Sequence, residues 1–160
     1  MNTQDTTDRA FPIPLTRAAL SKASWSHPVT FRHGHCDPAG IVYTPQFFHV
    51  FNEAIEAWFG AELGISYYDI IGPRRTGLGY VSASSVFFLP CRMGEQIDIH
   101  VTVARVGRTS YSLTLHAMLG DSEALRGEFT TVTTSLDTHR PIPVPEDIRR
   151  ALTDYSARCT

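Results

Sequence analysis

The sequence predicts one α+β domain in which a long helix packs against an antiparallel sheet. Apolar side chains recur at helical spacing from Pro45 to about Leu63. Beyond Gly77 and Gly79, apolar residues instead alternate with polar ones, which is the period of half-buried strands. At 160 residues, the chain suits one domain that needs neither disulfides nor metal to bury a core. A helix followed by a run of strands is typical of the α+β class.

The chain is expected to open with an arm, residues 1–26, that is flexible or draped over the surface. Pro12 and Pro14 interrupt its only apolar patch, and Asp5 and Asp8 occur before them. The segment therefore lacks the charged and then apolar build of a secretory signal.

The first elements of the domain lead through a turn into the helix. Alternation from Val29 to His33 predicts a strand that runs into a turn at Asp37. Thr44 has the side chain of an N-cap, and Pro45 suits the first helical position because its missing N–H costs nothing there. Apolar residues on several sides of the helix indicate that protein surrounds most of it, and glycines mark its end.

The second half of the chain is expected to hold a short helix and four strands. Ser66, three residues before Asp69, is placed to cap the short helix. The expected ranges are 67–71 for this helix and 80–89, 96–103, 111–117 and 124–136 for the strands. With the first strand and the long helix, they form a domain over residues 27–138. Residues 139–160 are expected to add a C-terminal extension with a proline-rich run and a short helix from Glu146 to Ala157.

Composition excludes several classes of partner. The net charge of -2 and the lack of a dense Lys/Arg cluster argue against nucleic acid or an anionic membrane as the main partner. No apolar run approaches the roughly 20 residues needed to span a bilayer. The three cysteines, Cys36, Cys91 and Cys159, are odd in number and widely spaced. They indicate a reducing compartment, with the cytoplasm as the default.

One short segment, His35 to Pro45, places an acid in a tight turn just before the helix. The first N–H groups of a helix lack intrahelical partners and carry the positive end of its dipole, so they are suited to polarising a carbonyl. Asp37 would then act on that carbonyl as nucleophile or general base. Turn chemistry explains the same residues without catalysis, because Asp-Pro-x-Gly forms a good turn. The residues alone leave both interpretations open.

A resemblance to known proteins favours the catalytic interpretation. The motif that carries it reads Asp37-Pro38-x-Gly40-Ile41-Val42-Tyr43-x-Pro45-x-Phe47, and an apolar helix with Glu53 and Glu56 follows. The chain resembles the hotdog-fold acyl-CoA thioesterases, in particular the 4-hydroxybenzoyl-CoA thioesterase branch, from about Val29 to about Leu136. This implies a long central helix wrapped by a curved antiparallel sheet. It also implies homodimers with active sites at the subunit boundary, assembling to a homotetramer, and no cofactor beyond the coenzyme A of the substrate.

The resemblance assigns roles around the helix start. Asp37 would attack the thioester carbonyl or activate water for that attack, and the backbone N–H of Thr44 would hold the oxyanion. Well-known members carry a tyrosine at the position of Thr44, a change that a backbone donor tolerates. Asn52 matches the aspartate that receives the substrate hydroxyl in the 4-hydroxybenzoyl enzyme. A neutral amide there argues against 4-hydroxybenzoyl-CoA itself, and leaves another aromatic thioester or a short acyl chain.

Further substrate contacts are expected from the helix and from a hairpin turn. Tyr43, Phe47, Phe48 and His49 are expected to line the substrate pocket at the start of the helix. By resemblance, Arg108 and Ser110 match the family's contacts to the nucleotide phosphates of coenzyme A, which guanidinium groups bind well. Ordinary solvated charge is the alternative interpretation of Arg108.

Three other interpretations compete with the thioesterase. A metal site would use His33, His35 and Cys36, with both histidines on one strand face, but nothing completes the three or four ligands that zinc needs, so no metal is expected. Cys36 is instead expected to be a buried structural cysteine. A hotdog dehydratase would need a histidine with an acid partner. A non-catalytic module would bind an acyl-CoA or aromatic ligand and would tolerate the loss of Asp37.

Overall fold

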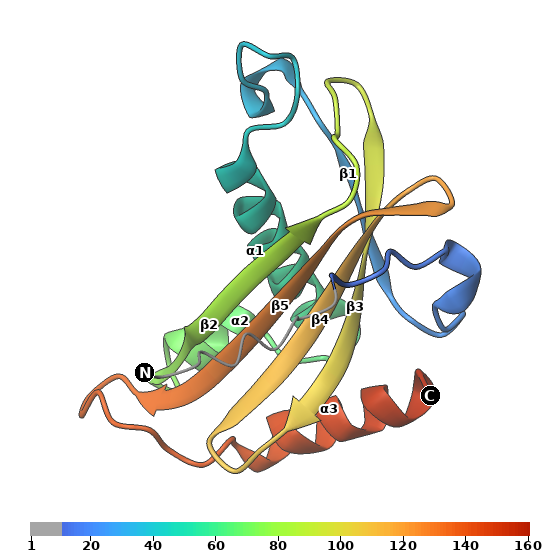
Figure 1. Cartoon of the computed structure of the whole chain (residues 1–160). Coiled ribbons are helices and arrows are strands. Elements are labelled where there is room, and N and C mark those ends of the chain that lie inside the picture. Colours follow the sequence, from blue (N-terminus) through green and yellow to red (C-terminus); the bar gives the residue numbers. More distant parts are fainter. Residues whose placement is uncertain (1–10) are drawn as a thin grey trace, which may run out of the picture.

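The computed structural model describes residues 11–160 and contains one five-stranded antiparallel sheet (Figure 1). The strands are β1 (Ser26–Thr30), β2 (Thr76–Phe87), β3 (Gln96–Val106), β4 (Ser110–Leu119) and β5 (Ser122–Ser135). Their order across the sheet is β1-β3-β4-β5-β2, so β1 and β2 form the two edges. Helix α1 (Thr44–Ala61) lies against one face. The expected α+β fold is confirmed.

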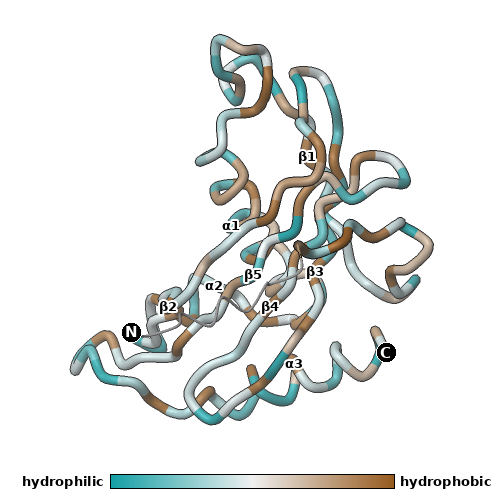
Figure 2. The backbone as a smooth tube through the Cα atoms, viewed as in Figure 1, coloured by the Kyte–Doolittle hydropathy of each residue, from teal (hydrophilic) through white to brown (hydrophobic). Residues whose placement is uncertain are grey.

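The core lies between α1 and the sheet. Every buried residue of α1 is apolar: Phe47, Val50, Phe51, Ala54, Ile55, Trp58 and Phe59. Hydrophobic and hydrophilic residues alternate along parts of the strands, as Figure 2 shows. Successive side chains of a strand point to opposite faces of the sheet, so the hydrophobic ones can share the face that packs against α1. Gly127 on β5 lets the helix approach closely. A Cβ atom there would lie 2.8 Å from ring carbons of Phe51 and Phe129, so a larger residue would push the layers apart.

The start of α1 differs by one residue from the expectation. Tyr43, not Thr44, is the N-cap, and Thr44 is the first helical residue. The N–H of Tyr43 donates to the carbonyl of His35 at 2.9 Å, and that of Gln46 donates to the carbonyl of Tyr43 at 2.8 Å. These backbone contacts start the helix one residue early, so the predicted N-cap was wrong. Pro45 is therefore the second helical residue and not the first, although it still lies in the first turn, where its missing N–H costs nothing.

The first strand also ends earlier than expected. β1 stops at Thr30, and residues His33–His35 form a turn of 3₁₀ helix, η2. The backbone N–H of Arg32 donates to Nδ1 of His35 at 2.8 Å, and this contact closes the turn. His33 and His35 therefore do not share a strand face, and the geometry assumed for a metal site was wrong.

The later elements follow the predicted order. Helix α2 (Tyr67–Ile71) is capped by Ser66, whose hydroxyl accepts a hydrogen bond from the N–H of Asp69 at 3.3 Å, as expected. Helix α3 (Glu146–Arg158) packs against β3. Its Tyr155 is fully buried, donates to the carbonyl of Val101 at 2.7 Å and stacks edge-on against Trp58 of α1. The C-terminal extension therefore shares the core of the domain.

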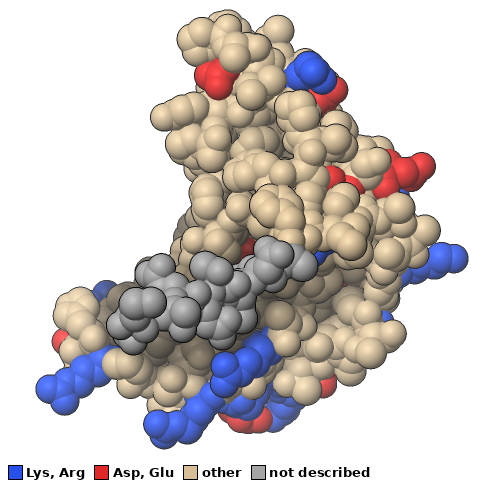
Figure 3. All heavy atoms as spheres, in the orientation of Figure 1, with Lys and Arg blue, Asp and Glu red and all other residues tan. Residues whose placement is uncertain are grey.

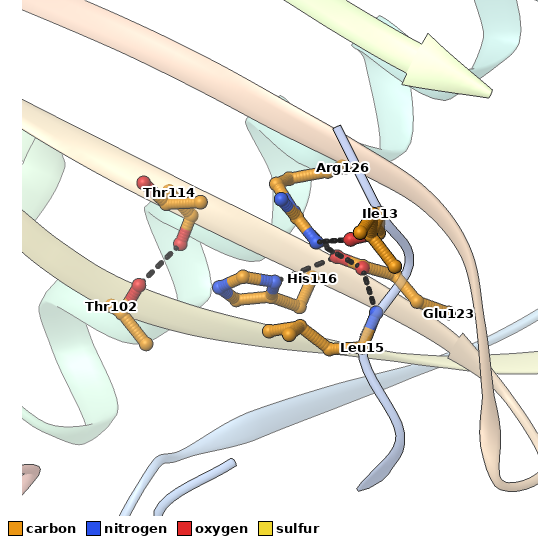
Figure 4. Close-up of polar contacts among 7 residues, drawn as sticks. All are labelled: Ile13, Leu15, Thr102, Thr114, His116, Glu123 and Arg126. Carbon is orange, nitrogen blue, oxygen red and sulfur yellow. Dashed lines mark hydrogen bonds and ion pairs between the residues drawn. The ribbon is translucent and has the colours of Figure 1, made fainter. Parts of the chain in front are cut away.

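The described part of the N-terminal arm, from residue 11, is tied to the β4–β5 hairpin (Figures 1 and 4). It contains a short 3₁₀ helix, η1 (Arg17–Ala19). The N–H of Leu15 donates to the buried carboxylate of Glu123 at 2.7 Å, and the carbonyl of Leu15 accepts from the N–H of Glu123 at 3.2 Å. Arg17 pairs with Asp98 of β3 at 2.8 Å. The first ten residues of the expected arm lie outside the described residues.

Candidate active site

Asp37 lies in a tight turn at the end of the molecule where α1 begins (Figure 1). Its backbone N–H donates to the carbonyl of Ile41 at 2.9 Å, and its carbonyl accepts from Gly40 at 3.0 Å. Gly40 has φ of 80°, a conformation that favours glycine. The N–H of Ala39 donates to Oδ1 of Asp37 at 2.8 Å. The carboxylate is partly exposed, and its Oδ2 has no hydrogen-bond partner within residues 11–160.

The turn is fastened beside the helix start by backbone hydrogen bonds. The N–H of Val42 donates to the carbonyl of Cys91 at 2.8 Å, and Tyr43 is held to His35 as described above. The next N–H, that of Thr44, finds no acceptor in the described part of the chain. Pro45 has no N–H to offer. Thr44 therefore presents a free donor at the positive end of the α1 dipole, close in the chain to the free oxygen of Asp37.

A mainly apolar pocket of about 340 Å³ opens at this helix start. It is lined by Ile41, Val42, Thr44, Phe47, Phe87, Phe88, Leu89, Pro90 and Cys91. Burial and the charge of Glu95 raise the pKa of the Cys91 thiol to about 11, so at neutral pH it is a protonated wall residue and not a nucleophile. Sequence patterns missed Cys91, because only the fold brings it beside Thr44.

A second hollow of about 840 Å³ runs along the outward face of α1. It is lined by His27, His49, Asn52, Glu53, Glu56, Ala57, Gly60, Ser66, Tyr67 and Tyr68, and we call it the α1 groove. Nε2 of His49 lies 3.3 Å from Glu53. Burial and the Glu56 carboxylate raise the pKa of Tyr67 to about 12, which keeps its hydroxyl neutral. Two carboxylates make the groove unfavourable for phosphate groups and better suited to an uncharged ligand.

The remaining helix residues fall in three different environments. Phe47 is buried against Phe31, with ring centroids 5.5 Å apart, and borders the apolar pocket. Phe48 is half-buried against Phe129 of β5. Tyr43 is exposed at the helix cap. Of the residues expected to line the substrate pocket, Phe47 borders the apolar pocket and His49 the α1 groove.

Asn52 is engaged by a residue that sequence patterns did not identify. The hydroxyl of Tyr80 on edge strand β2 donates to Oδ1 of Asn52 at 2.8 Å. The ring of Tyr80 packs against Phe129 at 5.2 Å between centroids. Tyr80 lies inside a predicted strand, but its contact with a helix residue 28 positions earlier depends on how the sheet folds over α1.

Arg108 and Ser110 lie at the other end of the sheet from Asp37. The β3–β4 turn that holds them is at the bottom of Figure 1, whereas the Asp37 turn is at the top. Arg149 of α3 donates to the carbonyls of Gly107 and Arg108 at 2.8 and 3.1 Å and holds this turn. Basic side chains gather along the same edge in Figure 3. Within a single chain, Arg108 and Ser110 therefore lie at the opposite end of the sheet from Asp37 and cannot share a site with it.

The structure also describes the surroundings of the candidate metal ligands and of Cys36. No group of three or more His, Cys, Asp or Glu side chains that could hold a metal ion occurs within residues 11–160. Cys36 is half-buried, less than expected, and its thiol donates to the carbonyl of Arg32 at 3.7 Å. Over the same residues, no helix is both long and apolar enough to cross a bilayer.

Comparison with known proteins identifies relatives of this chain. It is 28% identical over 120 residues to a 1,4-dihydroxy-2-naphthoyl-CoA hydrolase from Synechocystis, with 74% of this chain and 86% of the relative covered. A thioesterase-superfamily structure from Jannaschia superposes with a TM-score of 0.78 at 24% identity, covering 84% of this chain and 94% of the other. A Synechocystis 1,4-dihydroxy-2-naphthoyl-CoA thioesterase structure gives 0.76 at 23% identity, covering 82% and 96%.

The names of these relatives agree with the expectation that the chain is a hydrolase of CoA thioesters. They also confirm the resemblance to hotdog thioesterases. The model of the thioesterase-like superfamily matches residues 31–152, which include the Asp37 turn, the whole sheet after β1 and most of α3. The chain therefore belongs to the thioesterase-like superfamily.

Proposed function

We propose that this protein hydrolyses an aromatic acyl-CoA thioester, with Asp37 as nucleophile or general base and the Thr44 N–H as oxyanion donor. The observation that carries the proposal is the free Oδ2 of Asp37, in a turn fastened beside the unpaired N–H of Thr44. Two relatives, 28% and 26% identical, are named 1,4-dihydroxy-2-naphthoyl-CoA hydrolases. A structural neighbour of the same fold is a gentisyl-coenzyme A thioesterase. All three names describe hydrolysis of an aromatic CoA thioester.

The chemistry follows from the two groups at the helix start. The thioester carbonyl oxygen would accept a hydrogen bond from the Thr44 N–H, which stabilises the negative charge that develops there. Asp37 would either attack the carbonyl carbon or remove a proton from the attacking water. The C–S bond then breaks and coenzyme A leaves as the thiol. On the first route, water hydrolyses the resulting anhydride, and both routes give the free acid.

The assembly proposed for this reaction is a homodimer, two of which associate to form a homotetramer. Edge strand β2 has no charged residue, and within residues 11–160 its backbone has a neighbouring strand on one side only, β5. Tyr80 to Ser84 are exposed in succession, including Val81 at 64%. Proteins usually protect such an edge with charge, proline or a cover. A second copy pairing here would satisfy the backbone groups.

Pairing across β2 also accounts for the position of Arg108. An antiparallel two-fold contact inverts one copy relative to the other. The β3–β4 turn of the second copy would then lie at the end of the assembly that holds this chain's Asp37. In that arrangement Arg108 and Ser110 of one copy bind the phosphates of a coenzyme A whose thioester is cleaved at the other.

The acyl group is proposed to occupy hollows that carry little positive charge. The pocket at the helix start is mainly apolar, and the α1 groove holds aromatic rings and carboxylates. Aromatic acyl groups suit such walls better than charged ones do. A short-chain acyl group is the alternative. We further expect the protein to work in the cytoplasm, since Cys36, Cys91 and Cys159 are all free thiols.

Thiol release from a panel of acyl-CoAs tests this function. The panel contains benzoyl-, phenylacetyl-, 4-hydroxybenzoyl-, 1,4-dihydroxy-2-naphthoyl- and butyryl-CoA. Asp37→Asn should lower kcat by about 100-fold or more, because the amide keeps the turn but loses nucleophilicity and basicity. Asp121→Asn, an exposed aspartate in the β4–β5 turn, is the matched control and should keep full activity.

The same assay separates the alternatives. Turnover that survives in Asp37→Asn rejects this catalytic role. Binding of an acyl-CoA without thiol release by the wild type indicates a binding module. Hydration or dehydration of an acyl chain without thiol release indicates a dehydratase, for which His49 and Glu53 would be the histidine and acid to test first.

A further inference from the structure

The hydrogen bond between Tyr80 and Asn52 bridges the sheet and the helix at the edge of the α1 groove. Tyr80 comes from edge strand β2, and Asn52 lies on the outward face of α1, where it lines the groove. Their oxygens are 2.8 Å apart. Tyr80 is 38% exposed, and its ring is held against Phe129. The contact is therefore fixed by packing and is still open to a ligand.

This contact decides which polar groups of Asn52 remain available. A side-chain amide has a carbonyl acceptor and two N–H donors. The Tyr80 hydroxyl already donates to the carbonyl oxygen, and burial raises the pKa of Tyr80, so it stays a neutral donor. The amide N–H groups have no partner in the part of the chain that the structure describes. Asn52 therefore needs no hydroxyl from a ligand to satisfy its acceptor.

The position of the pair suits the far end of an acyl group. Asn52 follows Thr44 by eight residues, which is about 12 Å along a helix axis. An acyl group whose carbonyl is held at the Thr44 N–H and whose ring extends along α1 would bring its distal edge toward Asn52. Glu53 and Glu56 line the same groove and disfavour an anionic substituent there.

We propose that Tyr80 is a specificity-determining residue that lets this site accept aromatic acyl groups without a ring hydroxyl. The proposal rests on the thioesterase function and goes further by naming the residue that sets substrate range. A site built to hydrogen-bond a substrate hydroxyl rejects analogues that lack it, because its own polar groups are left unpaired. Tyr80 supplies that hydroxyl from the protein, so the Asn52 acceptor stays paired whichever ring is bound.

Removing one oxygen atom tests the proposal. Tyr80→Phe keeps the ring against Phe129 but frees the carbonyl of Asn52, which a substrate hydroxyl then satisfies. The ratio of kcat/KM for 4-hydroxybenzoyl-CoA to that for benzoyl-CoA should rise about five- to tenfold. Tyr68→Phe is the matched control: this tyrosine lines the same groove, is 75% exposed and makes no hydrogen bond to Asn52 within residues 11–160. Any change that this variant causes in kcat/KM should be the same for both substrates, so their ratio should equal that of the wild type.

A double variant and a binding measurement complete the test. In Tyr80→Phe with Asn52→Ala, the freed acceptor is gone and the ratio should return to a value near that of the wild type. Calorimetric titration with the thioethers S-phenacyl-CoA and S-(4-hydroxyphenacyl)-CoA, which cannot be hydrolysed, should show the same shift in relative affinity. Circular dichroism checks that each variant is folded.

Each outcome separates the inference from the function on which it rests. An unchanged ratio in Tyr80→Phe, in an enzyme that releases thiol, overturns the role of Tyr80 and leaves the thioesterase intact. A shift in thioether affinity, with no thiol released by the wild type, supports the role of Tyr80 in ligand choice and overturns hydrolysis. Failure of the wild type to bind either thioether or to release thiol overturns both.

Discussion

The carboxylate of Glu123 lies 2.7 Å from Nδ1 of His116, and both side chains sit on the β4–β5 hairpin beneath the N-terminal arm (Figure 4). Arg126 donates to both oxygens of this carboxylate, at 2.9 and 2.5 Å, and also to the carbonyl of Ile13 at 3.0 Å. The N–H of Leu15 completes the set. The Glu123 side chain is fully buried, so these donors replace the water that it loses on folding.

Removing this carboxylate should destabilise the fold strongly. We expect Glu123→Ala to lower the free energy of unfolding by about 3–5 kcal/mol, because it leaves Arg126 and the arm without their buried partner. Urea denaturation followed by circular dichroism measures the change. The matched control is Glu128→Ala, at an exposed glutamate of the same strand, which should shift stability by about 0.5 kcal/mol or less. Equal losses in both variants would contradict the structural role of Glu123.

Stability should also fall on mild acidification. Burial, followed by the charge of Arg17, lowers the pKa of His100 below its reference value of 6.5, with Asp98 acting in the opposite direction. The folded state thus binds a proton at His100 less readily than the unfolded state does, so stability is full above about pH 6.5 and decreases as the pH falls below it. Urea midpoints between pH 8 and pH 5 should show this decrease. His100→Gln should flatten the profile, and His33→Gln, at an exposed histidine, should not.

A second acid-sensitive step is expected at lower pH. Burial alone would raise the pKa of Glu123, but hydrogen bonds from Arg126, Leu15 and His116 outweigh it and lower the pKa below its reference value of 4.5. A depressed carboxylate pKa stabilises the fold above the unfolded value, and this contribution is lost as the pH falls through the folded pKa. Urea midpoints of the wild type should therefore drop again below about pH 4.5. Glu123→Gln should lack this second drop.

Coenzyme A binding should depend on Arg108. If its guanidinium group contacts phosphate equally in the ground and transition states, Arg108→Ala should raise KM several-fold and leave kcat nearly unchanged. Added salt should weaken binding more in the wild type than in the variant. Lys22→Ala, at an exposed lysine of the arm, is the control for a general loss of positive charge. If wild type and Arg108→Ala have the same KM, Arg108 does not bind coenzyme A and is an ordinary solvated surface residue.

The exposed edge of β2 should govern assembly. Val81→Lys places a charge on an edge strand that has none, and two-fold pairing would bring two such charges together. We expect the dimer dissociation constant to rise at least about tenfold, measured by light scattering coupled to gel filtration. Thr138→Lys, in the exposed loop after β5, adds the same charge away from the edge. A dimer that survives Val81→Lys would place the contact elsewhere.

Local patterns were sufficient to predict the order of the elements and the Asp37 turn. Alternation and helical spacing depend on neighbours in the chain, and so do the Asp-Pro-x-Gly turn and the Ser66 cap. The errors lie where another segment competes for the backbone. The carbonyl of His35 accepts from Tyr43 and moves the helix cap, while the His35 side chain closes the turn that ends the first strand region.

The candidate site was predictable only around the helix start. Asp37 and Thr44 are only seven residues apart in the chain, so a local motif contains both of them. Tyr80 reaches Asn52 because the folded sheet brings this part of β2 beside α1. Arg108 lies far from Asp37 because successive turns of an antiparallel sheet alternate between its two ends. No local pattern contains either relationship.

The hydrogen bond from Leu15 to Glu123 joins residues 108 positions apart and so sets an order of events during synthesis. Leu15 leaves the ribosome before its anchoring carboxylate, which is translated about 5–20 s later at ordinary elongation rates. Until the β4–β5 hairpin closes, Leu15 has no native partner, and the carboxylate of Glu123 is still hydrated when it emerges. Docking of the arm is therefore a late step that follows completion of the sheet, and a chain truncated before Glu123 would leave the arm undocked.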